Sequence, residues 1–459
     1  MLSIKRRSFL QASAAAGAML WLPDRAHGEV RGTVRRAVVL YLPGGVRWEA
    51  SFAAASSALH NPYGRLPWSV VPKALRAHQW TPGRPWPMSA IFHRRCFGME
   101  DLDRLQVEDT ADCCFAQPRL ARWPGAPSLP SFVSLAPQMS VLACDADPNQ
   151  PTQPEQLEHL PAQRRIFTGS PTGDRGLATL ATAALRGRTR LPPVVVDAPG
   201  FALGATDASQ PLCWYSLLGP PTDALAALGT DDAQAAVAGL AVDTAPPETA
   251  YGTTLEGAPL THAMLRQLFG TTDEDRVAGD PLREILGPAA GGDDLFGWQG
   301  ARAIRLLQHG APLVFLAAGD FDTHRDERSL GAAQLVRVGR LLSGLSFALH
   351  SVADPDTGAA LWDSTLVLLV SEFGRRGPNL LPDGFNPTGG SDHAREQYIP
   401  MMGGPLRLPG QRLDDGGRPY QTNRVWTSLF SAMGVPIDLA DQGLHRRQAP
   451  EIPGLLSIA

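Results

Sequence analysis

Short apolar runs alternate along this chain with longer segments of helical periodicity, and this alternation constrains the fold more than any other feature. A largely apolar run at 35–43 ends in a Gly-Gly turn, and similar runs occupy 140–144, 193–197, 312–317 and 364–371. Helical patterns precede the last two runs, at 299–309 and 330–351. Continuous apolar runs of this length are typical of strands buried on both faces of a parallel sheet. The pattern therefore predicts an α/β protein, a sandwich of helices around a mostly parallel sheet.

Polar residues able to carry chemistry follow the predicted strands. Ligands of such sheets bind at the carboxyl ends of the strands, because the connecting loops gather there. Oxygen and imidazole donors of the kind that hold Zn, Mn or Mg occupy these loops. The candidate metal ligands are Asp320, Asp322, His324, Glu372, Asp392 and His393. We expect the loops to bring these side chains into one pocket around a divalent metal.

Each group by itself also has an ordinary structural explanation. Asp322 could cap the helix that follows, as acidic side chains commonly do. Glu372 could pair with Arg375 or Arg376 at the surface, where an ion pair contributes little to stability. Asp392 and His393 could be a solvated loop pair. The occurrence of all three groups at strand ends favours a site over these alternatives.

The N-terminus has the pattern of a twin-arginine signal peptide. Paired arginines precede a Phe-Leu pair in Lys5-Arg6-Arg7-Ser8-Phe9-Leu10, as this export pathway requires. The apolar run at 12–22 is shorter than the roughly 20 residues of a membrane span, although an uncleaved anchor is the alternative. Small residues at 26–28 predict cleavage near residue 28. We therefore expect contact with the twin-arginine translocase, no stable membrane span, and a folded mature protein in the periplasm or outside the cell.

The mature chain, residues 29–459, is long enough for a single large α/β domain. Residues 51–130 are rich in Pro and Trp, and 214–300 have mostly helical patterns, which indicates elaborations over the edge of the sheet. The tryptophans among those prolines favour packing under loops over a carbohydrate-binding role. The chain has 41 Lys and Arg against 45 Asp and Glu, a net charge of −4. This balance excludes the basic surface that a nucleic-acid partner needs.

Several motifs taken together resemble a known family. They are Val39-Leu40-Tyr41-Leu42-Pro43-Gly44-Gly45, Phe321-Asp322-Thr323-His324, Ser371-Glu372-Phe373-Gly374-Arg375 and Ser391-Asp392-His393, after an arginine-pair signal. In this order they resemble domain-of-unknown-function family 1501, whose members are sulfatase-like proteins placed with the alkaline-phosphatase-like hydrolases. The resemblance is best from about residue 296 to 404.

The resemblance implies a three-layer α/β/α sandwich with a metal pocket at the strand ends. Hydrolases of that superfamily use metal ions, often two, and a Ser, Thr or formylglycine nucleophile to attack phosphate or sulfate esters. Carried over to this chain, Asp320 or Asp322 with His324 would hold one metal, and His393 would complete it. Asp392 and Glu372 would support or share that metal. Arg375 would steady the substrate anion by a bidentate contact.

The chain departs at three places from the pattern usual in that superfamily, which often has an Asp-His pair where Glu372 and Phe373 stand. Phe373 stands where the second member of an Asp-His pair would be. Only Glu49 lies near the end of the first strand, where a metal-binding Asp is usual. The nucleophile's usual position, before Thr168-Gly169, holds His159, which could be a ligand, a base, a nucleophile or an ordinary packed imidazole. The fallback hydroxyls are those of Thr152, Thr168 and Ser170.

Two hypotheses of function follow. The first is an exported, metal-dependent hydrolase that acts on a phosphate or sulfate ester of a small molecule or polymer, with His159 and Arg375 as catalytic residues. The second is a non-catalytic scaffold or binding protein of the periplasm or cell surface, built on a degenerate hydrolase fold. The departures from the family's pattern motivate the second, because a fold alone does not imply a function.

Overall fold

The computed structural model describes residues 33–53, 57, 59–62, 135, 138–145, 158–168, 176–185, 188–189, 193–195, 295–327, 330–376, 380–410, 412–435 and 450–457. The expected signal peptide lies outside these residues, as do Thr152, Ser170 and most of the two expected elaborations. Among the described residues, no helix is both long enough and apolar enough to span a membrane.

A mostly parallel sheet forms the centre of the protein. Its strands are β1 (Arg36–Tyr41), β2 (Met139–Asp145), β3 (Val194–Val195), β4 (Leu313–Ala317), β5 (Thr365–Val370), β8 (Glu396–Gly403), β9 (Arg412–Leu413) and β10 (Tyr420–Gln421). They are ordered β10-β2-β8-β5-β1-β4-β3, and β9 also pairs with β2. Only β8 runs antiparallel to its neighbours β2 and β5. The apolar runs that predicted buried parallel strands are therefore confirmed.

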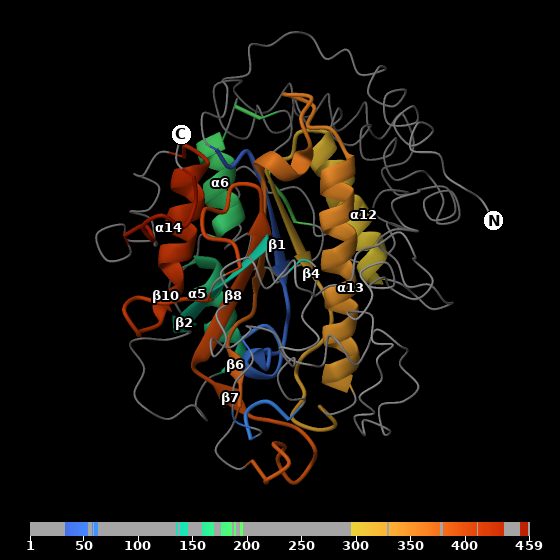
Figure 1. Cartoon of the computed structure of the whole chain (residues 1–459), viewed down its shortest axis with the longest axis vertical. Helices are drawn as coiled ribbons and strands as arrows, with labels where there is room; N and C mark the ends of the chain where they lie inside the picture. The colour runs from blue at the N-terminus through green and yellow to red at the C-terminus, as the bar shows by residue number, and fades with distance from the viewer. Residues whose placement is uncertain are drawn as a thin grey trace, which may run out of the picture.

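Helices cover both faces of this sheet (Figure 1). On one face lie α12 (Leu295–Gln308) and α13 (Leu330–Ser351); on the other lie α5 (His159–Thr168), α6 (Leu177–Leu185) and α14 (Thr422–Ala432). Alternate side chains of β1 point to opposite faces, so Val38 and Leu40 pack with the α12 and α13 core, and Val39 with the other. This arrangement confirms the predicted three-layer α/β/α sandwich.

The carboxyl ends of three central strands coincide. Tyr41, the last residue of β1, is opposite Ala317 of β4 and Val370 of β5. The chain segments that follow these strands therefore leave the sheet at one edge and lie close together. The turn after β1 has Gly44 at a φ of 98°, and a Cβ there would meet the backbone nitrogen of Asp322 at 2.1 Å. Only glycine lets the two loops approach so closely.

A small second sheet extends this edge. It consists of β6 (Gly374–Arg375) and β7 (His393–Ala394), which run antiparallel with Arg375 opposite His393. Val46 forms a parallel bridge to Gly374, which joins the turn after β1 to this ribbon. The loops after β1 and β5 and the segment before β8 are thus linked by backbone hydrogen bonds.

A buried ion pair lies near the start of β1. Arg36 donates from Nη1 to Asp354 Oδ2 at 2.5 Å and from Nη2 to Asp356 Oδ2 at 2.6 Å. Ser364 also donates to Asp354 Oδ2, at 2.8 Å. Burial alone raises the pKa of Asp354, but the Arg36 guanidinium and these hydrogen bonds outweigh burial and leave the pKa below its ordinary value.

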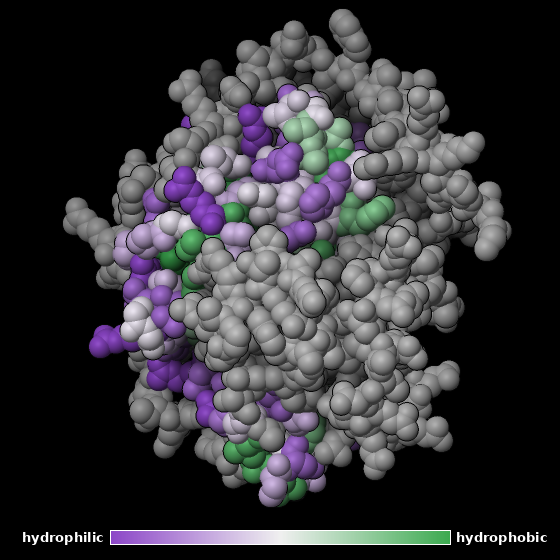
Figure 2. Space-filling model, viewed as in Figure 1, coloured by the Kyte–Doolittle hydropathy of each residue, from purple (hydrophilic) through white to green (hydrophobic). Residues whose placement is uncertain are grey.

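Polar and apolar residues are interspersed on the described part of the face seen in Figure 2. The large apolar side chains that are exposed among the described residues are Leu59, Leu160, Leu330 and Leu381. Scattered exposed leucines of this kind are normal on globular proteins and require no partner.

Candidate metal site

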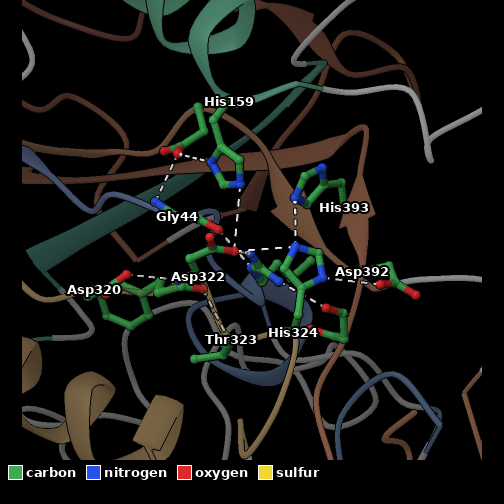
Figure 3. A network of polar contacts seen from close by, with 12 residues as sticks. Gly44, His159, Asp320, Asp322, Thr323, His324, Asp392 and His393 are labelled. Atoms are coloured by element: carbon green, nitrogen blue, oxygen red, sulfur yellow. Dashed lines mark hydrogen bonds and ion pairs between the residues drawn. The ribbon is translucent and has the colours of Figure 1, made fainter. Parts of the chain in front are cut away.

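Four donor side chains meet at the shared strand edge (Figure 3). They are His159, Asp322, His324 and His393, and one ligand atom from each lies within 4.8 Å of the other three. His159 is the first residue of α5, Asp322 and His324 belong to the loop after β4, and His393 begins β7. The side chains of the first three are 31%, 44% and 46% exposed, so the cluster is open to solvent.

The distances between these donors fit a metal ion. Nε2 of His324 lies 3.2 Å from Nε2 of His393 and 3.3 Å from Oδ1 of Asp322. Nε2 of His159 lies 3.6 Å from the same oxygen. Metal–ligand bonds of 2.0–2.2 Å place two tetrahedral ligands about 3.3–3.6 Å apart. Three imidazoles and one carboxylate suit Zn²⁺ better than Mg²⁺, which prefers oxygen ligands.

Glu372 lies behind His159 rather than in the cluster. Its side chain is fully buried, and Oε1 lies 2.9 Å from Nδ1 of His159. Oε1 also accepts from the Gly44 amide at 2.8 Å, and Oε2 accepts from the Tyr41 hydroxyl at 2.7 Å. Burial raises the pKa of Glu372, but the hydrogen bonds that it accepts, from His159 first, outweigh burial and leave the pKa below its usual range. Glu372 was predicted to be a metal ligand, but its carboxylate instead contacts His159, one of the four donors.

Asp392 has the same relation to His324. Its Oδ1 lies 3.2 Å from Nδ1 of His324, which turns Nε2 of that ring toward the other donors. An ionised carboxylate can only accept, so the neighbouring ring nitrogen is the one that carries hydrogen. Two histidines of the cluster are therefore each held by a carboxylate, an arrangement common around metal-ligating imidazoles.

Arg375 is buried, and its guanidinium links three segments of the site by hydrogen bonds. Its Nε donates to the Gly44 carbonyl at 2.7 Å, Nη1 donates to the Ser391 carbonyl at 2.9 Å, and Nη2 donates to Oδ1 of Asp322. Burial is the main cause that lowers the pKa of Arg375, and Asp322 opposes that shift. The geometry gives this guanidinium a positioning role, in place of the expected bidentate contact with a substrate anion.

Asp320 lies outside the cluster, contrary to its expected role as a ligand. Its Oδ1 accepts from the backbone N–H of Asp322 at 3.1 Å, in a turn that spans two residues. Its backbone carbonyl accepts from Gln334 at 2.9 Å. The carboxylate of Asp320 therefore stabilises the turn that presents Asp322, as short acidic side chains commonly do.

Phe373 forms an apolar wall beside the donors. Its ring centroid lies 4.1 Å from that of His393 and 4.9 Å from that of His159, and the side chain is fully buried. The ring of Phe373 thus supports two imidazoles of the cluster by packing. Glu49 does not join the cluster; it lies 3.8 Å from Nε of Arg376.

Tyr41 is a functional candidate that the sequence analysis did not single out. Its hydroxyl contacts a buried carboxylate, and the available signal was its position at the end of the first predicted strand. Two described hydroxyls close to the site donate to backbone carbonyls, Thr323 to Phe321 and Ser371 to Leu42, whereas the buried hydroxyl of Ser391 has no hydrogen-bond partner among the described residues. Thr168, a fallback nucleophile, lies at the far end of α5 from His159.

Comparisons with known proteins give weak structural neighbours. The crystal structure of Ps i-CgsB is 15% identical with a TM-score of 0.22, covering 34% of this chain and 42% of that one. Ps i-CgsB in complex with k-i-k-neocarrahexaose is 11% identical with a TM-score of 0.32, covering 89% and 74%. Phosphonate monoester hydrolase SpPMH from Silicibacter pomeroyi is 10% identical with a TM-score of 0.27, covering 70% and 71%. No curated protein matches the sequence.

A family model matches the sequence directly. The family described as "Protein of unknown function (DUF1501)" matches residues 250–418. This segment contains the loop after β4, the end of β5 and the residues of β7. The resemblance to family 1501 is therefore confirmed for the segment that supplies Asp322, His324 and His393, three of the four donors of the cluster.

Proposed function

We propose that this chain is a metal-dependent hydrolase that acts on a phosphate or sulfate ester of a small molecule or polymer. The observation that carries the proposal is the solvent-open group of three imidazoles and one carboxylate at the carboxyl edge of the sheet. Sites of this kind, at strand ends in α/β proteins, are where substrates commonly bind. The exposed sides of Asp322 and His324 leave room for an anionic group to approach the donors.

In this proposal His159, Asp322, His324 and His393 hold the metal. A bound divalent cation supplies positive charge that stabilises developing negative charge and makes a bound water more acidic. The protein's own contribution is orientation, because Glu372 and Asp392 each keep a proton on Nδ1 of the histidine that they contact. Because the Thr323 and Ser371 hydroxyls donate to backbone carbonyls, water is favoured over either of these two side chains as the nucleophile.

A second candidate is a non-catalytic binding or scaffold protein. It is favoured by one observation: the cluster has four side-chain donors, the number that fills a tetrahedral shell. Closed four-coordinate shells are typical of structural zinc sites, whereas catalytic sites usually keep one position open. Under this proposal the metal would lock together the loop after β4, the start of α5 and the small ribbon.

The deciding experiment expresses the full-length chain in its native host and purifies the exported, mature protein. Metal content is measured as isolated and after incubation with Zn²⁺ or Mn²⁺, followed by a screen of phosphate and sulfate esters. Turnover that His324→Ala abolishes and His350→Ala preserves supports the hydrolase; His350 lies in α13 and stacks on Trp362. Metal binding without turnover favours the binding protein. Protein that takes up neither metal contradicts both.

Export through the twin-arginine pathway is part of the proposal and rests on Arg6 and Arg7. Replacing both by lysine keeps the charge but removes the paired guanidinium groups that the pathway requires. We expect the double variant to accumulate inside the cell, whereas the unchanged chain is recovered from the periplasm or medium. Equal recovery of the two from outside the cell would exclude this route.

A further inference from the structure

The fully buried carboxylate of Glu372 lies directly behind the candidate metal site and is not one of the four donors. Glu372 follows β5, and its oxygens accept hydrogen bonds from two other parts of the chain. The Tyr41 hydroxyl and the Gly44 amide come from the end of β1, and His159 comes from the start of α5. Gln163 of α5 adds a fourth, longer donor to Oε1, at 3.4 Å. Such complete satisfaction holds one carboxylate in one orientation.

We infer that Glu372 is a positioning residue that fixes His159 in the tautomer with hydrogen on Nδ1, so that Nε2 presents its lone pair to the cluster. The carboxylate can only accept, so Nδ1 at 2.9 Å must donate. Nε2 of the same ring then faces Oδ1 of Asp322 at 3.6 Å. This inference rests on the proposed function and assigns to Glu372 a role outside the metal's ligands.

Tyr41 extends this role into the central sheet. Its hydroxyl donates to Oε2 of Glu372 at 2.7 Å, and its ring packs edge-on against Phe167 of α5 at 5.2 Å. One side chain of β1 therefore contacts both the carboxylate and the helix that begins with His159. Partners of metal-ligating histidines commonly change metal affinity about 10–100-fold when replaced. We expect Tyr41 to act in the same direction as Glu372 but more weakly.

The first test reads the tautomer without any metal. Full-length protein with ¹⁵N-labelled histidine, stripped of metal by EDTA, is examined by long-range ¹H–¹⁵N correlation, and His159→Gln assigns the ring signals. We expect His159 to carry hydrogen on Nδ1 in the unchanged protein and to lose this preference in Glu372→Leu. Glu372→Gln should keep it, because the Gly44 and Gln163 donors require an oxygen at the Oε1 position.

The second test measures Zn²⁺ affinity by competition with a chromophoric chelator. Glu372→Leu should weaken binding about 10–100-fold, Tyr41→Phe should weaken it less, and Glu372→Gln should recover most of the loss. Asp415→Asn is the matched control: this exposed carboxylate pairs with Arg424, and its replacement should leave the affinity unchanged.

The outcomes separate this inference from the proposed function. If the unchanged protein binds no Zn²⁺, the proposed function fails, and the tautomer measurement still decides the role of Glu372. Hydrogen on Nε2 of His159 in the metal-free protein would overturn the inference, as would a Glu372→Leu protein with unaltered affinity. If Glu372→Leu does not fold, Tyr41→Phe replaces it in the test. Unaltered Zn²⁺ affinity of Tyr41→Phe would then overturn the inference that the Tyr41–Glu372–His159 contacts position the cluster.

Discussion

Nε2 of His324 lies 3.2 Å from Nε2 of His393, although 69 residues separate the two histidines in the chain. Because Nδ1 of His324 donates to Asp392, its Nε2 carries a lone pair directed at the second ring. Such an approach is favourable when a cation lies between the two nitrogens. We therefore expect a bound metal to stabilise these loops.

Added Zn²⁺ should accordingly raise the resistance of the metal-stripped protein to urea. A ligand that binds only the folded state contributes about 2.7 kcal/mol at a concentration 100 times its Kd. His324→Ala or His393→Ala should remove this increment, whereas His350→Ala should keep it. Urea unfolding with EDTA and with Zn²⁺ measures the difference. An equal increment in His324→Ala would place the bound ion elsewhere.

The two acidic residues of the loop after β4 should behave differently. Asp320→Asn retains the oxygen that accepts from the Asp322 amide, so Zn²⁺ affinity should change by less than about threefold. Asp322→Asn loses a charged donor of the cluster, so its effect should reach at least the roughly tenfold loss seen for indirect partners of metals. Competition titrations on both variants provide the comparison, and equal losses would contradict the geometry.

The strand pattern predicted where the site lies but not which side chains enter it. Asp322, His324 and His393 follow from topology, because the loops at the carboxyl edge must gather there. Asp320 and Asp322 are indistinguishable by residue type, and only the turn that Asp320 stabilises separates them. The sequence left His159 with several roles, since the position of a helix start relative to a sheet depends on packing that no local pattern encodes.

The inner residues of the site were harder to assign for the same reason. Glu372 and Phe373 are adjacent, and the bend after β5 buries the carboxylate under His159 and the ring beside His393. Arg375 was expected to contact a substrate anion because it follows a predicted strand and a guanidinium can bind an anion through two hydrogen bonds. Its burial results from the ribbon of β6 and β7, which the sequence analysis did not predict.

Replacement of Arg375 should mainly reduce stability. Arg375→Met leaves the Gly44 and Ser391 carbonyls without their donor, and each unsatisfied buried group costs about 1–3 kcal/mol. Arg375→Lys cannot reach all three acceptors, so its free energy of unfolding should lie between those of the unchanged chain and of Arg375→Met. Urea unfolding of metal-free protein tests this, with Arg376→Lys as a partly exposed control that should stay within about 1 kcal/mol of the unchanged chain. A stable Arg375→Lys enzyme with a raised KM would restore the anion-binding role.

The Arg36–Asp354 pair should give the protein a pH dependence in the acid range. The pKa of folded Asp354 is below its unfolded value, so the pair's contribution is present above the unfolded pKa. That contribution is lost as the pH falls through the folded pKa. Asp354→Asn should cost about 3–5 kcal/mol at pH 7, because it leaves a buried guanidinium with one partner fewer. Urea unfolding of both proteins should give curves that converge only below about pH 4; a constant difference would argue against the ion pair.

Phe373 should link stability to metal binding. The ring is fully buried against His393 and His159, so Phe373→Ala should cost about 3–5 kcal/mol through loss of packing and the cavity left behind. Phe373→Leu fills most of that volume and should cost less.

Because the ring supports two of the four donors, both variants should also bind Zn²⁺ more weakly, in the same order as their stability losses. Unfolding and chelator competition on the same samples test this order. Leu307→Ala, at a fully buried residue of α12, provides the comparison, because it should lower stability with no change in Zn²⁺ affinity. Unaltered Zn²⁺ affinity in Phe373→Ala would show that His159 and His393 keep their positions without packing against this ring.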